Sequence, residues 1–339
     1  MLTRLDPRLI GLAVLIVLAM LLPLYAPWTK VMLTLALAKG LAVLGIVVLL
    51  AAGQVSFGHA LFFAVSAYAA AFLGRAFGGG ELITMVVLGV GASLAVGLVV
   101  GLFVVRYRYI FFGMLNLAFS MILFSILEKF YHFTGGSDGI QVARPTVLGA
   151  SLDRNAFEFL LFYGGLVIAV CVALLVHRFL QSPLGNMMRT IASNETRLEY
   201  LGVSARGVLL TGYLVSAGLC GLGGVMMAVA QGIVTPEYTW WVRSGELVFI
   251  AILGGAHSVA GAFIGALVYE AVRTYASAFA SDVWQMILGF FLLGIILYAP
   301  KGLIGLANRF LPARRAAAQA AVDDPPVASP SRKAMEPGE

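Results

Sequence analysis

The stretch at residues 208–230 reads VLLTGYLVSAGLCGLGGVMMAVA and contains no charged side chain. A helix needs roughly 17–25 mainly apolar residues to cross the hydrocarbon core of a bilayer. Other uncharged runs at 11–22, 41–52 and 283–299 approach or reach this length. These runs predict a polytopic membrane protein whose solvent is lipid rather than water.

The composition of the whole chain agrees with this interpretation. Hydrophobic residues make up 61% of the sequence and charged residues 11%, whereas about one quarter of an average soluble domain is charged. The net charge is +6, and the positive residues gather at the ends of apolar runs rather than on one basic element. The charge therefore predicts an orientation across the membrane, not binding of nucleic acid.

Apolar runs and their Gly, Pro and charged boundaries predict an all-α transmembrane bundle of about ten helices. Between residues 53 and 58, and again between 254 and 261, two short helices meet at glycine. There, two full spans and one broken or re-entrant element both remain open. The predicted membrane domain covers residues 1–308, and residues 309–339 form a disordered cytoplasmic tail because they lack apolar periodicity. The predicted helices lie near 9–26, 31–52, 59–74, 81–105, 110–128, 157–177, 207–231, 240–255, 259–275 and 283–299.

Arginine placement sets the predicted orientation. With ten spans and both termini in the cytoplasm, the cluster of Arg178, Arg189, Arg197 and Arg206 faces the cytoplasm, as the positive-inside rule requires. The opposite orientation places this cluster outside and is rejected.

The predicted cytoplasmic loop at 179–206 contains SPLGNMMRTIASNETRLEYLG at residues 182–202. Ser182 is placed to cap a short helix with Pro183 at its first position, Asn194 to cap a second one, and Gly202 to end it. Leu184, Met187, Met188 and Ile191 fall on one face and Arg189 on another. Such an amphipathic element either docks into a cytoplasmic partner or lies against lipid.

The same loop resembles the coupling loop of ABC-importer permeases, in particular the branched-chain amino-acid permease family. Ser182, Pro183, Gly185, Asn194, Glu195 and Gly202 match that pattern. GQVSFGHA at 53–60, NLAF at 116–119 with TGGSDGI at 134–140, LGG at 253–255 and PKGL at 300–303 are similar to further motifs of the family and of its LivM-like subunit. The similarity covers most of residues 31–307. Asn186 and the uncharged pair at 192–193 depart from the family pattern.

The resemblance implies an ABC-importer permease fold in the bacterial cytoplasmic (inner) membrane. It implies a related permease subunit, two cytoplasmic ATPase subunits and an external substrate-binding protein as partners, with Met188 and Arg189 in the ATPase-coupling surface. The implied cargo is a branched-chain or similar hydrophobic amino acid; urea, short amides and aromatic acids are alternative cargoes. An ion-gradient-driven transporter or channel, and a scaffold without cargo, are the alternative functions.

Catalytic motifs are missing from the sequence. It contains no phosphate-binding GxxxxGK[ST] loop, no HExxH or CxxC pair and no nucleophile motif. We therefore expect no enzyme activity, no metal site and no cofactor in this chain, with ATP hydrolysed by partner subunits.

The break at 53–59 is one candidate for the translocation pathway or gate. Gln54, Ser56 and His59 offer hydrogen-bonding groups to a passing zwitterion, or else hold a packing turn together. Lys39 lies inside an apolar run, where ionisable side chains are costly. It either attracts a substrate carboxylate, or snorkels outward or pairs with Glu246.

A second candidate region is the predicted external loop at 134–140. Gly135 and Gly136 permit turn conformations that present Ser137 and Asp138 to the binding protein. A plain connecting turn accounts for the same glycines.

Overall fold

The computed structural model describes residues 20–23, 25–76, 80–280, 282–299 and 302–310. Within these ranges the chain is a helical bundle with one two-residue antiparallel ribbon, in which β1 (Ile140–Gln141) pairs with β2 (Ile233–Val234). Five helices are long and apolar enough to cross a membrane. They are α2 (Thr29–Ala51), α4 (Leu82–Val104), α5 (Tyr109–Lys129), α7 (Arg154–Gln181) and α9 (Ala205–Gln231).

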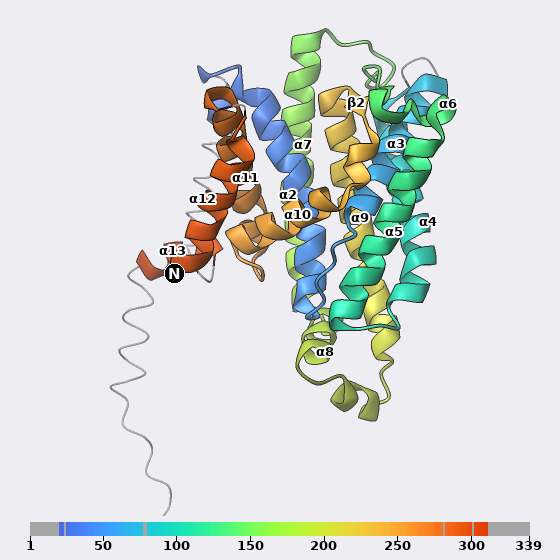
Figure 1. The fold of residues 1–339 in the computed structure, drawn as a ribbon, viewed down its shortest axis with the longest axis vertical. Coiled ribbons are helices and arrows are strands. Elements are labelled where there is room, and N and C mark those ends of the chain that lie inside the picture. The colour runs from blue at the N-terminus through green and yellow to red at the C-terminus, as the bar shows by residue number, and fades with distance from the viewer. Residues whose placement is uncertain (1–19, 24, 77–79, 281, 300–301, 311–339) are drawn as a thin grey trace, which may run out of the picture.

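Shorter helices complete the bundle. Figure 1 shows α8 at one end of the molecule, here called the α8 end, and α6 with the β-ribbon at the other, here called the α6 end. The shorter elements are α3 (Ala60–Ala76), α6 (Tyr131–Thr134), η1 (Gly136–Asp138), α8 (Pro183–Tyr200), η2 (Pro236–Thr239), α10 (Trp241–Gly254), α11 (Val259–Phe279), α12 (Trp284–Tyr298) and α13 (Gly302–Phe310).

The prediction of an all-α bundle is confirmed, and each predicted helix from 31–52 to 283–299 has a counterpart. The predicted first helix lies mostly outside the described residues, as does the tail from residue 311 onward. The predicted boundary at residue 308 falls inside α13, a helix that the sequence analysis did not predict. Predictions about the two termini therefore stay predictions.

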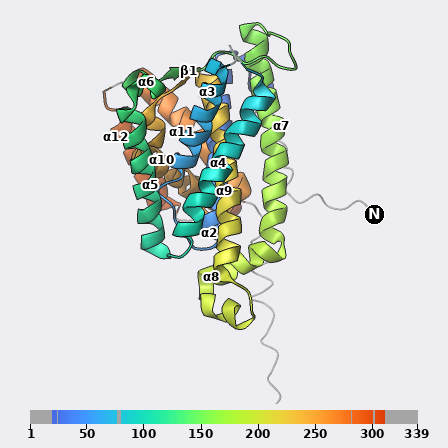
Figure 2. The ribbon, with the colours of Figure 1, turned by 90° about the vertical axis from the view of Figure 1, so that its right-hand side faces the viewer.

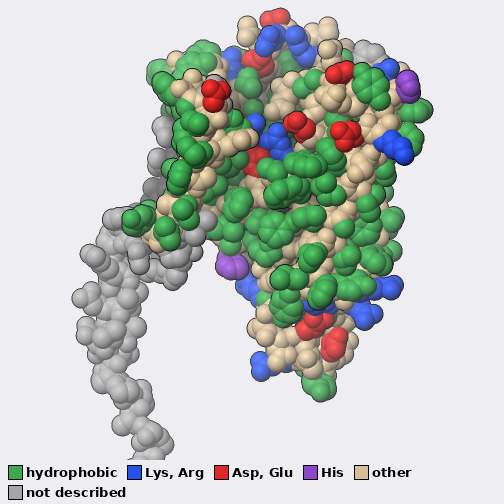
Figure 3. Space-filling view, viewed as in Figure 1, with side chains coloured by type: hydrophobic (Ala, Val, Ile, Leu, Met, Phe, Trp, Pro, Cys, Tyr) green, Lys and Arg blue, Asp and Glu red, His purple; other side chains and the backbone are tan. Residues whose placement is uncertain are grey.

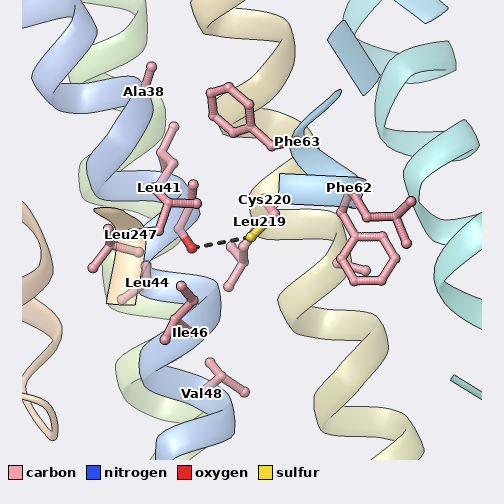
Figure 4. Packing of buried hydrophobic residues seen from close by; sticks show 14 of the residues in the cluster. Ala38, Leu41, Leu44, Ile46, Val48, Phe62, Phe63, Leu219, Cys220 and Leu247 are labelled. Carbon is pink, nitrogen blue, oxygen red and sulfur yellow. Dashed lines mark hydrogen bonds between the residues drawn. The ribbon is translucent and has the colours of Figure 1, made fainter. Parts of the chain in front are cut away.

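Helices α2 and α9 form the centre of the bundle. Most of α2 is buried, whereas α4, α5 and α7 expose apolar faces of the kind that contact lipid. Figure 2 shows α4, α5 and α7 along the outside of the bundle. Small residues allow the two central helices to approach closely, because a Cβ on Gly223 would lie 2.4 Å from the Ala38 carbonyl oxygen. Figure 4 shows this contact layer, with Cys220 Sγ 3.3 Å from the Ala42 carbonyl oxygen.

The first break follows α2. Gly53 has φ +69°, and the chain stays non-helical until α3 begins at Ala60. His59 is hydrogen-bonded to the same Ser216 hydroxyl that donates to Gly45, so the segment runs back alongside α2 before α3 starts (Figure 1). The structure thus makes 53–59 the non-helical part of a broken element. Its polar side chains Gln54, Ser56 and His59 are buried in protein, as membrane depth requires, whereas Gly53 and Phe57 are exposed.

The second break joins α10 to α11 at an angle of 115°. The helix ends touch backbone to backbone, because a Cβ on Gly254 would lie 1.8 Å from the Gly261 carbonyl oxygen. With 14 residues, α10 is about 21 Å long, shorter than the roughly 30 Å hydrocarbon core. The length and the bend agree with the broken or re-entrant alternative for 240–255, and the number of membrane crossings in this region stays a prediction.

Candidate functional site

Helix α8 consists of two short helices, as the sequence predicts. The Ser182 hydroxyl accepts a hydrogen bond from the Gly185 N–H at 3.4 Å, and Pro183 takes the first helical position. Asn194 is extended (φ −163°, ψ 100°), and its side chain accepts from the Arg197 N–H at 3.1 Å. Gly202 has φ +77° and ends the second helix. Both predicted caps are confirmed, and they fix where each of the two short helices begins.

The apolar face of α8 holds this element against the bundle. Met188 is fully buried, and its thioether group packs directly over Gly212 of α9. Ile191 is buried beside it, whereas Leu184 and Arg189 are exposed. The predicted apolar face is therefore buried only in part, and the exposed remainder is surface available to another chain.

An ion pair ties the second short helix to the loop between α4 and α5. Arg108 Nη2 lies 2.6 Å from Glu195 Oε1, and Arg108 Nε donates to Glu195 Oε2 at 2.8 Å. Arg108 also donates to the Tyr107 carbonyl at 2.9 Å, which fixes the guanidinium on its own loop. We call this bidentate pair of Arg108 and Glu195 the clamp. The sequence analysis missed the clamp because 87 residues separate its members.

The broken segment is hydrogen-bonded to two elements distant in sequence, α5 and α9. The Gln54 side-chain carbonyl accepts from the N–H of Tyr109, a non-glycine residue with φ +52° at the start of α5. His59 Nδ1 lies 2.6 Å from the Ser56 hydroxyl, and Nε2 lies 2.6 Å from that of Ser216.

These contacts assign the protons of the imidazole. The Ser216 hydroxyl donates its one hydrogen to the Gly45 carbonyl at 2.6 Å, so its oxygen accepts from Nε2–H of His59. In the neutral ring, Nδ1 then accepts from the Ser56 hydroxyl at 2.6 Å. Since both ring nitrogens have buried partners, His59 joins α2, α3 and α9 in this conformation.

Lys39 lies in a buried ion network. Its Nζ is 2.5 Å from Glu246 Oε1 of α10 and 2.7 Å from Glu270 Oε2 of α11. Arg243 Nη1 reaches the second oxygen of Glu246 at 3.0 Å, and Arg273 lies 3.9 Å from Glu270. The predicted pairing with Glu246 is confirmed, and Glu270 is a partner that the sequence analysis missed.

The loop at 134–140 forms the tight turns predicted for it. Gly135 (φ +70°) and Gly136 (φ +51°) both adopt left-handed conformations, and they present Ser137 and Asp138 on the surface in η1. The Tyr131 hydroxyl donates to Asp138 Oδ2 at 2.6 Å, and this bond raises the pKa of the tyrosine.

The bundle has membrane-length helices, a broken central element and a buried ion network, and the two-helix element α8 lies at one end. These features are those of a polytopic membrane permease. A sequence model described as "Branched-chain amino acid transport system / permease component" matches residues 29–297. The chain belongs to this family, which is a family of transport permeases and not of enzymes.

Curated relatives carry the same description. The chain is 28% identical over 288 residues to the high-affinity branched-chain amino acid transport system permease protein LivM of Escherichia coli (strain K12), covering 79% of this chain and 67% of the relative. For LivM of Salmonella typhimurium (strain LT2) the identity is 26%, over 76% of this chain and 65% of the relative. The chain thus spans about two thirds of the length of these relatives. LivH of Escherichia coli (strain K12) is 26% identical over 37% of this chain and 40% of its own length. No solved structure matches.

Proposed function

We propose that the chain is the membrane-spanning subunit of an ATP-driven importer in the bacterial inner membrane, carrying branched-chain or similar hydrophobic amino acids. The family membership and the transport system named for its relatives support the class and the cargo. A related permease subunit, two cytoplasmic ATPases and an external binding protein complete the importer. The chain itself binds no cofactor, and ATP is used by the ATPases.

The observation that carries this proposal is the docking of α8 on the bundle. Ser182, Pro183, Gly185, Asn194 and Gly202 build the element locally, and Met188 anchors it on α9. The arginines of α8 and of the adjoining ends of α7 and α9 lie at the same end of the molecule. The positive-inside rule then places the α8 end, with exposed Arg189, in the cytoplasm, facing the ATPases, and we infer that both termini are cytoplasmic.

A motion of α8 would reach the broken segment by two short routes. The clamp connects Glu195 to Arg108, and the next residue, Tyr109, donates its N–H to Gln54. Alternatively, Gly53 lies directly against Ala192, since a Cβ on this glycine would be 3.1 Å from the alanine side chain. We infer that the segment containing Gln54, Ser56 and His59 acts as a gate that α8 moves.

The α6 end then faces the external binding protein. Gly135 and Gly136 shape the turn that exposes Ser137 and Asp138, and the β-ribbon links this turn to the segment before α10. This arrangement gives the binding protein a folded surface at the α6 end.

Reconstitution tests the proposal. The chain is placed in proteoliposomes with its partner permease, ATPases and binding protein, and uptake of radiolabelled leucine, urea, a short amide and an aromatic acid is measured with and without ATP. We expect ATP-dependent uptake of hydrophobic amino acids. Uptake that proceeds without ATP under an ion gradient would instead establish a secondary transporter.

A further inference from the structure

A pocket opens beside the buried ion network, between α2, α3, α9 and α10. The pocket is open to the surface, and its empty space is about 390 Å³ when the solvent at its mouth is counted. The apolar part of its wall is formed by Phe63, Met227 and Leu247. The charged side chains that line it are those of Lys39, Arg243 and Glu246. Figure 3 shows acidic and basic side chains gathered in a hollow beside a mainly apolar surface. Ligand pockets in proteins combine an apolar lining with a few polar groups in this way.

Among these charged groups, Lys39 is already fully engaged. Its ammonium lies within 2.7 Å of two carboxylates, Glu246 and Glu270, and its side chain is 3% exposed. A ligand carboxylate would have to displace one of them and leave a buried anion without its partner. Lys39 therefore does not fit the role of a carboxylate acceptor in this conformation.

Arg243 is differently placed. Its side chain is 32% exposed at the pocket wall, and Nη1 donates to Glu246 Oε2 at 3.0 Å. A guanidinium carries five N–H donors in a planar fork, and a carboxylate is bound by two parallel donors of such a fork. Glu246 holds the group in position through one bond, because its other oxygen is held by Lys39.

We propose that Arg243 is the carboxylate-binding residue of a cargo subsite in this pocket. The ligand is a small hydrophobic acid, such as a branched-chain amino acid, with its carboxylate on Arg243 and its side chain against Phe63, Met227 and Leu247. Lys39 is a positioning residue that fixes Glu246. This inference rests on the proposed function and narrows it, since urea and neutral amides carry no carboxylate to pair with two donors of the Arg243 guanidinium.

The test measures binding to the assembled importer in detergent, without its binding protein. Thermal stability is recorded with millimolar leucine, 4-methylvalerate and leucinamide. The first two carry a carboxylate and the third does not. Ligands that bind the folded state raise its stability in proportion to ln(1 + [L]/Kd). We expect stabilisation of the wild type by both acids and not by the amide.

Variants then locate the site. Arg243→Gln should weaken binding of both acids by about tenfold or more, and Arg243→Lys by less, because lysine keeps the charge but loses the fork. Arg273→Gln is the matched control, since it removes an arginine from the same network away from the pocket wall. Assembly with the ATPases and basal ATP hydrolysis report folding of each variant.

Three results would overturn the inference: equal stabilisation by acid and amide, no ligand effect on the wild type, or equal losses in Arg243→Gln and Arg273→Gln. The comparison of acids with the amide on the wild type tests the inference even where a variant fails to assemble. Failure of the proposed function is distinguishable, because it shows as absence of ATP-dependent leucine uptake by the complete wild-type system.

Discussion

Breaking the clamp should uncouple uptake from ATP hydrolysis. The variants are Arg108→Gln, Glu195→Gln and the double variant, which remove the charges but keep similar side-chain size. In the structure the pair is bidentate at 2.6 and 2.8 Å, and the two side chains are 16% and 30% exposed. Charged hydrogen bonds in buried settings contribute about 1.5–3 kcal/mol and exposed ion pairs about 0.2–1 kcal/mol. This partly buried pair should contribute about 1–2 kcal/mol, or roughly 5–30-fold in an equilibrium.

The assay is leucine uptake per ATP hydrolysed in proteoliposomes, with basal ATPase activity measured in parallel. Each single variant should lower this ratio by roughly 5–30-fold, and the double variant should be no worse than the poorer single one, because both changes remove the same contact. The charge-reversed pair Arg108→Glu with Glu195→Arg should recover part of the loss.

A matched ion pair provides the control. Arg154 and Glu158 form one contact at 3.0 Å on α7, with the arginine side chain 73% exposed, so the coupling energy there should stay within about 0.5 kcal/mol. If the effects of Arg108→Gln and Glu195→Gln multiply in the double variant, or if neither changes the ratio, the clamp does not transmit motion.

Three further substitutions test the broken elements. Gly58→Ala should abolish uptake and lower thermal stability, because its Cβ would lie 2.0 Å from the Asn116 carbonyl oxygen, whereas Gly91→Ala has open space around it and should be neutral in both assays. Gly254→Ala should prevent the backbone contact with Gly261, which a lowered melting temperature or failed membrane assembly would report. Ser216→Ala should cost about 1–3 kcal/mol of unfolding free energy by leaving buried polar groups unpaired, and a melting temperature equal to that of the wild type would contradict the hydrogen-bonding role given to Ser216.

The sequence predicted those features whose causes are local. Ser182 and Asn194 satisfy N–H groups only three residues away, so their caps follow from spacing alone. The burial of Met188 follows from helical periodicity. Apolar length likewise predicted α2, α4, α5, α7 and α9, because a bilayer imposes one minimum length on each spanning helix.

Long-range pairings had no comparable signal. Hydropathy marked Lys39 as unusual, and depth in the membrane suggested Glu246, but Glu270 becomes a partner only through the 115° bend before α11. The bend itself depends on contact between Gly254 and Gly261, which a sequence shows only as two glycines. For the same reason the sequence indicates only that Arg108 lies at a membrane edge. Its pairing with Glu195 follows from the position of α8 in the fold.

A non-helical segment at membrane depth is suited to transmit a discrete motion. A continuous helix satisfies its own backbone hydrogen bonds and meets its neighbours mainly through side-chain packing. The segment at 53–59 instead depends on partners in other elements, through Gln54 to α5 and through His59 to α9. Each bond is either made or replaced by another, since an unpaired polar group in this setting costs several kcal/mol. We therefore expect the segment to change between a few defined arrangements as α8 moves, with the clamp selecting among them.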